Sequence, residues 1–313
     1  MKNDVQQELP IAVTPPSLIN IILKWTKRIF TPLALGFLIY FGWQSYDILA
    51  TIITNAQLHF LILAIFFLII VHFLAPRSVV LIFKTCGSSL SYPFALHTHI
   101  NRLPARYLPG GIWHTVGRTM DFYQHGIKPV HLTAFVLLEN LFAVGIAFII
   151  GGGCVWYFRG MMDIWGKVAA IGCLCSGLGL SLVPKILNWQ ILKSDYQVNY
   201  RFYFQTIGIY IFIFVLMALA FIAYLSAFSL ILKEMSILEI GGTYIFSWGI
   251  GLIAIFAPQG IGIFEIVAGN MLTISLSLGS LAILIAGFRV VAFIADITVW
   301  ILLRLYRLLH KSN

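Results

Sequence analysis

The chain has 313 residues, of which 60% are hydrophobic and 10% are charged, and its mean hydropathy is +0.94. This composition excludes an ordinary soluble domain, soluble enzymes included, and is typical of a polytopic membrane protein. The formal charge of +9 would indicate nucleic-acid binding in a soluble protein. In a membrane protein the distribution of charge between loops reports topology instead, so we expect no nucleic-acid partner.

The beginning of the chain lacks the basic start, short apolar core and small-residue cleavage site of a secretory signal. We therefore expect the first hydrophobic segment to be retained as an anchor. Ser17–Phe30 has an apolar and a basic face and fits equally well a helix at the membrane surface or the start of the first span. The expected organisation is a cytoplasmic tail with an interfacial helix (1–30), one transmembrane domain (31–305) and a basic cytoplasmic tail (306–313).

A helix needs ~20 apolar residues to cross a bilayer, and eight segments meet that requirement. They lie near 31–50, 58–75, 132–151, 164–183, 203–225, 240–257, 261–278 and 281–303. The second segment ends before Pro76, and Val79–Phe83 after it is interpreted as interfacial or re-entrant. Glycine, proline and polar residues predict broken or re-entrant helices around 84–120 and 257–270. The predicted fold class is all-α, a polytopic membrane protein with about eight transmembrane helices.

The basic residues predict the orientation of the chain. With eight spans both termini lie on one side, and most of the 20 Lys and Arg residues fall on that side. Only Arg159, Lys167 and Lys233 fall on the opposite side, and Arg289 stays within the membrane. Because cytoplasmic loops carry the excess of basic residues, we expect cytoplasmic termini and a cytoplasmic opening for the loop at 101–118.

The motif Pro-Gly-Gly-Ile at 109–112 has an echo, Pro-Gln-Gly-Ile, at 258–261. A further helical segment follows each copy, which suggests an internal repeat whose broken helices meet at a binding site, as in many transporters. Chance or a common loop geometry is the alternative explanation of so short a match. Both copies open to the cytoplasm in the eight-span topology, which implies a parallel repeat, and a misplaced span would make it an inverted one.

Glycine and proline in these motifs end one helix and begin another, which leaves backbone N–H groups at a helix N-terminus for a phosphate. Arg106 and Arg118 lie close to the first break and are predicted to add bidentate contacts to that phosphate. Arg102 is interpreted as an anchor to lipid head groups. The sequence therefore places a candidate anion site at this break.

Four ionisable residues lie within predicted spans: Glu139, Glu265, Arg289 and Asp296. Ionisable groups are costly at membrane depth and are usually paired or functional. We expect Arg289 to pair with Glu139 or with Glu265. The same groups are also candidates to bind a substrate phosphate or to carry a coupling proton, and the sequence leaves these roles open. Asp296, near the cytoplasmic end, is predicted to be structural.

Five histidines surround the first loop, at positions 97, 99, 114, 125 and 131. Their spacing does not fit a metal site, and the four cysteines indicate neither a disulfide framework nor a zinc site. No nucleophile elbow, phosphate-binding P-loop or pair of catalytic carboxylates is present. We therefore expect no metal, no cofactor and no enzymatic activity, and among the histidines we single out His114 beside the turn.

Four motifs occur in order: Arg106–Trp113 with Gly117-Arg118, then Leu137–Leu141, Pro258–Glu265 and Phe288-Arg289. In these residues the chain resembles the flippase-like family defined by the transmembrane region of lysylphosphatidylglycerol synthases, which also includes stand-alone membrane proteins of polysaccharide and lipid loci. The soluble aminoacyl-transferring domain of the synthases has no counterpart here. Asn140, Gln259 and Phe264 depart from the family pattern, which has arginine at the first and last of these positions, so the family's lipid is not carried over.

The resemblance implies a non-enzymatic transporter or flippase in the bacterial inner membrane, for an anionic phospholipid or a polyprenyl-linked sugar in cell-envelope lipid or polysaccharide biogenesis. The alternative is a membrane enzyme, or an accessory subunit of a glycosyltransferase partner, that acts on lipid-linked glycans. The expected substrate-binding residues are Arg106, Pro109, Gly110, Gly111, Trp113, His114, Arg118, Glu139, Asn140, Pro258, Gly260, Gly262, Glu265 and Arg289.

Overall fold

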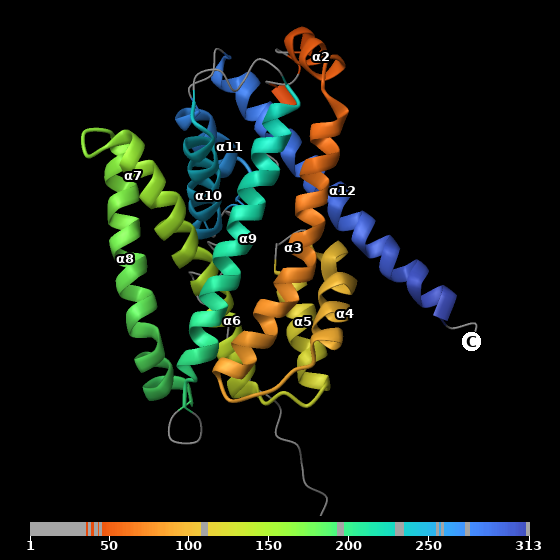
Figure 1. Cartoon of the computed structure of the whole chain (residues 1–313), viewed down its shortest axis with the longest axis vertical. Helices are drawn as coiled ribbons and strands as arrows, with labels where there is room; N and C mark the ends of the chain where they lie inside the picture. The colour runs from red at the N-terminus through yellow and green to blue at the C-terminus, as the bar shows by residue number, and fades with distance from the viewer. Residues whose placement is uncertain are drawn as a thin grey trace, which may run out of the picture.

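The structure is a computed structural model that describes residues 46–107, 112–192, 197–228, 235–254, 260–272 and 276–310, together with residues 36, 39, 40, 43 and 257. Every regular element within these residues is a helix, and the helices form one bundle (Figure 1). The tail 1–30 with its expected interfacial helix lies outside the described residues. So does most of the expected first span near 31–50, of which α2 (Tyr46–Thr54) includes the end.

Within the described residues, five helices are long and apolar enough to cross a membrane. They are α3 (Leu58–Thr85); the continuous run of α6 (Pro129–Ala147), the π-helical turn η2 (Phe148–Gly152) and α7 (Gly153–Arg159); α8 (Ile164–Ile186), extended by η3 (Leu187–Leu192); α9 (Tyr200–Ser226); and α12 (Leu278–His310). The all-helical membrane class is thereby confirmed. The described residues contain five such helices, whereas eight spans were predicted. The predicted spans near 240–257 and 261–278 are shorter helices, and the one near 31–50 lies mostly outside the described residues.

Helix α3 continues through Pro76 instead of ending before it. Val79–Phe83, which we expected to be interfacial or re-entrant, forms the buried lower part of this helix. Phe83 stacks on Phe135 of α6. The expectation is wrong because it treated proline as a helix stop, whereas membrane helices tolerate proline when neighbouring groups satisfy the freed backbone.

Two pairs of shorter helices form hairpins. The first consists of α4 (Tyr92–Arg102) with the 3₁₀ turn η1 (Leu103–Tyr107), followed by α5 (Trp113–Gln124); the second consists of α10 (Ile237–Ile253), followed by α11 (Ile263–Met271). Because α11 has only nine residues, it is about 14 Å long. The expected span near 261–278 is therefore wrong, and the chain is broken at both regions where glycine and proline predicted a break.

The two hairpins lie in opposite halves of the bundle. Figure 1 shows α4 and α5 in the lower half and α10 and α11 in the upper half. Among the described residues between the hairpins, three helices are long enough to span a membrane, and an odd number of crossings takes the chain to the other face. The expected parallel arrangement is wrong because it counted the segment near 240–257 as a complete fourth crossing. The hairpins instead have inverted orientations.

The turn between α10 and α11 depends on glycine. Gly260 and Gly262 have φ values of +66° and +84°, a left-handed conformation that residues with a Cβ rarely adopt. A Cβ on Gly260 would also lie 2.7 Å from the Cα of Gly251 on α10. The turn therefore returns closely against the helix that precedes it, and Glu265 is positioned one turn into α11 as a result.

Candidate functional site

Arg118 and Glu139 form a bidentate ion pair between α5 and α6. Arg118 Nη1 donates to Glu139 Oε1 at 2.9 Å, and Nη2 donates to Oε2 at 2.6 Å. The Arg118 side chain is 5% exposed, and its guanidinium lies over the ring of Phe135. The hydroxyl of Tyr210 on α9 donates to the main-chain oxygen of Glu139 at 3.3 Å. Glu139 thus pairs with Arg118, and the expected alternative with Arg289 is wrong.

Arg289 and Glu265 form a second ion pair, between α12 and α11. Arg289 Nε donates to Glu265 Oε1 at 2.5 Å, and Glu265 is buried. The other carboxylate oxygen accepts the backbone N–H of Gly262 at 2.7 Å. This N–H group was a candidate for phosphate, but Glu265 already occupies it. Phe264 lies under the Arg289 guanidinium, so the phenylalanine that departs from the family pattern packs against this pair.

Asp296 accepts hydrogen bonds from side chains of two other elements. His72 Nε2 of α3 lies 2.8 Å from Asp296 Oδ1. The Arg106 guanidinium and the Tyr107 hydroxyl of η1 donate to Oδ2 at 3.2 and 2.9 Å. Asp296 is buried, and it lies two helical turns after Arg289 on the same side of α12. Helix α12 therefore connects the second hairpin to the first.

Three buried histidines lead from Asp296 toward α5. His72 Nδ1 lies 3.3 Å from His99 Nε2 on α4, and the His99 and His114 rings meet edge-on with centroids 5.6 Å apart. His99 Nδ1 and His114 Nε2 are buried without a hydrogen-bond partner among the described residues. Burial, and after it positive charges that include Arg118 and Arg106, lowers the pKa of His99 and of His114 well below the usual value. Both rings are therefore neutral at neutral pH.

We call this set of contacts the buried polar network. It joins α3, α4, η1, α5, α6 and α12, and most of its side chains are buried, whereas Arg106 and Tyr107 are partly exposed. Its members are His72, His99, Arg106, Tyr107, His114, Arg118, Glu139 and Asp296.

The structure brings six of the fourteen predicted residues to this network or to the second ion pair. Arg106, His114, Arg118 and Glu139 belong to the network, and Glu265 and Arg289 form the pair. The predicted residues Pro109, Gly110, Gly111 and Pro258 lie outside the described residues.

Other predicted residues have different surroundings. Asn140 lies on the exposed side of α6, and its amide nitrogen donates to the oxygen of Val136 on the same helix at 2.8 Å. Consecutive helical residues point in different directions, so Glu139 faces the network and Asn140 does not. Trp113, at the start of α5, is 48% exposed. Gly260 and Gly262 shape the second turn, as described above.

Four members of the network were not among the predicted site residues: His72, His99, Tyr107 and Asp296. His72 was not singled out, and Asp296 was assigned a structural role, yet both are buried and bonded to each other. The signal that could have found His72 is an ionisable side chain in the middle of an apolar span, because such residues are usually functional. The contact itself could not be found from sequence, since α3 and α12 are far apart along the chain.

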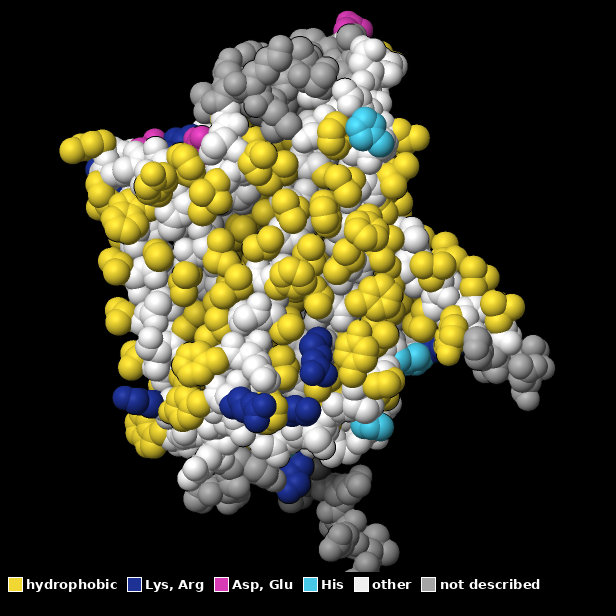
Figure 2. Space-filling model, viewed as in Figure 1, with side chains coloured by type: hydrophobic (Ala, Val, Ile, Leu, Met, Phe, Trp, Pro, Cys, Tyr) yellow, Lys and Arg dark blue, Asp and Glu magenta, His cyan; other side chains and the backbone are white. Residues whose placement is uncertain are grey.

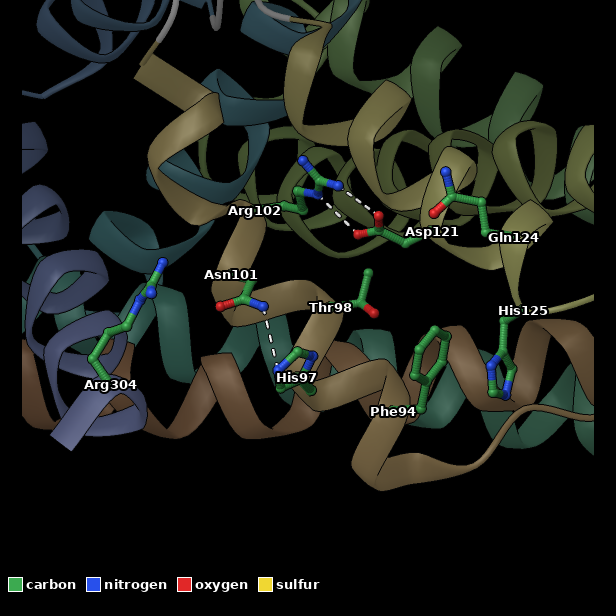
Figure 3. A pocket seen from close by; sticks show the side chains of 9 residues that line it. All are labelled: Phe94, His97, Thr98, Asn101, Arg102, Asp121, Gln124, His125 and Arg304. Atoms are coloured by element: carbon green, nitrogen blue, oxygen red, sulfur yellow. Dashed lines mark hydrogen bonds and ion pairs between the residues drawn. The ribbon is translucent and has the colours of Figure 1, made fainter. Parts of the chain in front are cut away.

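A cleft of about 540 Å³ opens on the other side of α4 (Figure 3). Arg102 donates to both carboxylate oxygens of Asp121, at 2.8 and 2.5 Å, and so joins α4 to α5. Arg102 was expected to anchor the loop to lipid head groups, but its guanidinium bonds to protein. His97 lines this cleft and lies 3.3 Å from the Asn101 amide. His97 and His99 are two residues apart on α4 and therefore point to different sides of it. His97 lines the cleft, whereas His99 belongs to the network.

No protein-family model matches the sequence, and a search of curated proteins finds no match to it. Within the described residues, no group of three or more His, Cys, Asp or Glu side chains is arranged to hold a metal ion. The features of the fold that bear on function are the two inverted hairpins, the buried polar network and the second ion pair.

Proposed function

We propose that this chain is an integral membrane transporter of the flippase type that moves an anionic phospholipid or a polyprenyl-linked sugar across the membrane. The observation that carries the proposal is the position of the buried charges. Arg118 belongs to the first hairpin, Arg106 to the turn within it, and Arg289 pairs with the second hairpin. Two broken hairpins of opposite orientation thus hold one buried arginine, Arg118, and two partly exposed arginines, Arg106 and Arg289, against carboxylates of the bundle.

Ionisable side chains within a membrane are costly and mark substrate or ion pathways. Arginine suits a phosphate because its planar fork donates two parallel hydrogen bonds. Each of the three arginines contacts a carboxylate here, Glu139, Asp296 or Glu265. We infer that these carboxylates neutralise the arginines in the substrate-free state and give way to the phosphate of the substrate.

Inverted hairpins support transport rather than static binding. In many transporters, broken helices from two inverted halves meet near the middle of the membrane, and motion of one half against the other exposes the site to each face in turn. The hairpins α4–α5 and α10–α11 lie in opposite halves of the bundle (Figure 1), and α12 contacts both through Asp296 and Arg289. The resemblance of the sequence motifs to the flippase-like family supports the same function.

We propose that the lower face in Figures 1 and 2 is cytoplasmic. Hydrophobic side chains cover the middle of the visible surface, and Lys and Arg side chains gather toward its lower end. The ends of spanning helices at that face carry Lys84, Lys128, Lys185 and Arg201, whereas the α7–α8 connection at the other face carries Arg159 paired with Asp163. The excess of basic residues on cytoplasmic loops predicts this orientation. The bacterial inner membrane is the location we propose.

Reconstitution tests the function. The purified full-length chain is placed in vesicles, and the movement of labelled phosphatidylglycerol and of a labelled polyprenyl-linked sugar between leaflets is measured. We expect transfer of one of them by the unchanged chain, and loss of that transfer in Arg118→Ala and Glu265→Gln without unfolding. Arg201→Ala, which changes an exposed arginine at the start of α9, is the control and should transfer normally.

Two results would contradict the proposal. Normal lipid transfer by both Arg118→Ala and Glu265→Gln would show that these residues do not form the substrate-binding site. Chemical conversion of the lipid-linked sugar by the purified chain, with no movement of the intact lipid, would favour the membrane enzyme over the transporter.

A further inference from the structure

Asp296, His72 and His99 form a continuous line of hydrogen-bonding atoms. His72 Nε2 lies 2.8 Å from Asp296 Oδ1, and His72 Nδ1 lies 3.3 Å from His99 Nε2. In the tautomers that donate along this line, His72 Nε2–H donates to the carboxylate and His99 Nε2–H donates to His72 Nδ1. His99 Nδ1 then has a lone pair, and this atom is buried without a partner among the described residues.

We propose that His99 and His72 form a proton path that protonates Asp296 and thereby weakens its attraction for Arg106, in favour of the anionic head group of the substrate. The inference rests on the proposed function for the identity of that anion. The proton comes from the aqueous phase on the side from which the α4–α5 hairpin enters. The path ends at a carboxylate that the substrate itself must displace.

The proton transfer balances at every atom. A proton binds His99 Nδ1, while the Nε2–H bond of His99 breaks and an N–H bond forms at His72 Nδ1. The Nε2–H bond of His72 then breaks, and an O–H bond forms at Asp296 Oδ1. One proton has entered, both rings have changed tautomer, and one carboxylate has become neutral.

The consequence for Arg106 follows from charge. Arg106 Nη1 donates to Asp296 Oδ2 at 3.2 Å, and the Arg106 side chain is 38% exposed while that of Asp296 is 4% exposed. An arginine loses most of its attraction to a carboxyl group once that group is neutral. Its guanidinium can then turn toward a phosphate without leaving an uncompensated negative charge buried behind it. A singly charged phosphate and a proton therefore enter the site together as a neutral pair.

The charges around the histidines agree with this role. Elements on several sides of His99 supply them: His72 from α3, Arg106 and Tyr107 from η1, His114 and Arg118 from α5, Glu139 from α6 and Asp296 from α12. Burial, and after it the neighbouring positive charges, keeps His99 neutral at rest, so a proton on it is short-lived and passes on. An anion near Arg106 or Arg118 would offset these positive charges and favour proton uptake, and the proton would favour the anion in return.

The test measures proton entry and lipid transfer in one preparation. The full-length chain is reconstituted in phosphatidylcholine vesicles that contain a pH-sensitive dye and labelled phosphatidylglycerol, and the outside is acidified. We expect internal acidification that depends on the chain, together with acid-stimulated lipid transfer. His99→Gln keeps a polar side chain but cannot pass a proton, and it should lower both rates on the order of a hundred-fold.

His97→Gln is the matched control. It changes the same residue type on the same helix, but His97 lines the separate cleft, so both rates should match those of the unchanged chain. Asp296→Asn is a second variant in case His99→Gln does not fold. It retains an oxygen acceptor for His72, cannot accept the proton, and should likewise abolish acid-stimulated transfer.

The outcomes separate the two proposals. Lipid transfer by the unchanged chain with no proton entry, or normal proton entry in both His99→Gln and Asp296→Asn, overturns the proton path and leaves the transporter in place. Proton entry that His99→Gln removes, in vesicles that move no lipid, overturns the lipid transporter and retains the path. Equal loss of proton entry in His97→Gln and His99→Gln also overturns the path, because the control lies outside it.

Discussion

Arg118 of α5 and Glu139 of α6 face each other through two hydrogen bonds of 2.9 and 2.6 Å in the interior of the bundle. This pair holds the first hairpin to a spanning helix, and it is also the first candidate contact for a substrate phosphate. If the role of the pair is structural, removing both charges should destabilise the protein; if its role is binding, removing both charges should abolish lipid transfer without a large loss of stability. The stability of single and double variants distinguishes them.

We expect Glu139→Gln to lower the free energy of unfolding by about 3 kcal/mol, because it leaves the Arg118 guanidinium buried without a counter-charge. The double variant Arg118→Met with Glu139→Leu should recover most of that loss, since it removes both charges and keeps apolar volume. Denaturant titration in mixed micelles measures both. A double variant less stable than Glu139→Gln would show that the pair itself stabilises the fold. Lipid transfer should be lost in both variants.

We expect Gly260→Ala to lower the stability of the second turn by about 1–3 kcal/mol, because alanine is strained at positive φ and its Cβ would contact Gly251. Thermal unfolding followed by circular dichroism measures the effect. Gly208→Ala is the control, since a Cβ there meets nothing within 4 Å. An equal change in both variants would argue against a tight turn at Gly260.

The inverted orientation of the hairpins predicts opposite accessibility of their outer ends. In a chain without its four native cysteines, Gln124→Cys at the end of α5 and Ser236→Cys before α10 should react with a membrane-impermeant maleimide from opposite sides. Mass spectrometry of sealed vesicles, before and after permeabilisation, reads out the side. Labelling of both cysteines from the same side of the membrane would show that the hairpins are parallel and contradict the inverted orientation.

The lowered pKa of His99 predicts a loss of stability in acid. Below the usual histidine pKa of 6.5, the unfolded chain binds a proton that the folded chain does not, so stability falls as pH decreases from that value. One such group contributes up to about 1.4 kcal/mol per pH unit. Thermal unfolding between neutral and mildly acidic pH should show a smaller decrease in His99→Gln than in the unchanged chain. The same pH slope in both would contradict a neutral, buried His99.

The sequence predicted the membrane class well because hydrophobic length is a local property. Runs such as those in α8 and α9 are apolar over the width of a bilayer, and each is recognisable without its neighbours. Glycine and proline located the two breaks for the same reason, since they restrict the backbone where they occur. Pro76 misled the prediction because its effect depends on what packs around it.

The ion-pair partners of the charged residues could not be predicted from the sequence. Arg289 had two plausible carboxylates in the sequence, and only the packing of α11 against α12 selects Glu265. Asp296 looked structural, while the fold places His72 and Arg106 on its two oxygens. The predicted orientation of the hairpins was wrong. It depends on whether the number of membrane crossings between them is odd or even, so one helix too short to cross reverses it.

By itself the sequence therefore determined that the chain is helical, lies in a membrane and has two broken segments with buried charges, because hydropathy and backbone restriction act over a few residues. Which charges meet, and from which face each hairpin enters, was decided only by the tertiary structure. Ion pairs and hydrogen bonds require atoms within about 3 Å, and only the packing of distant helices brings His72, His99 and Asp296 to that separation.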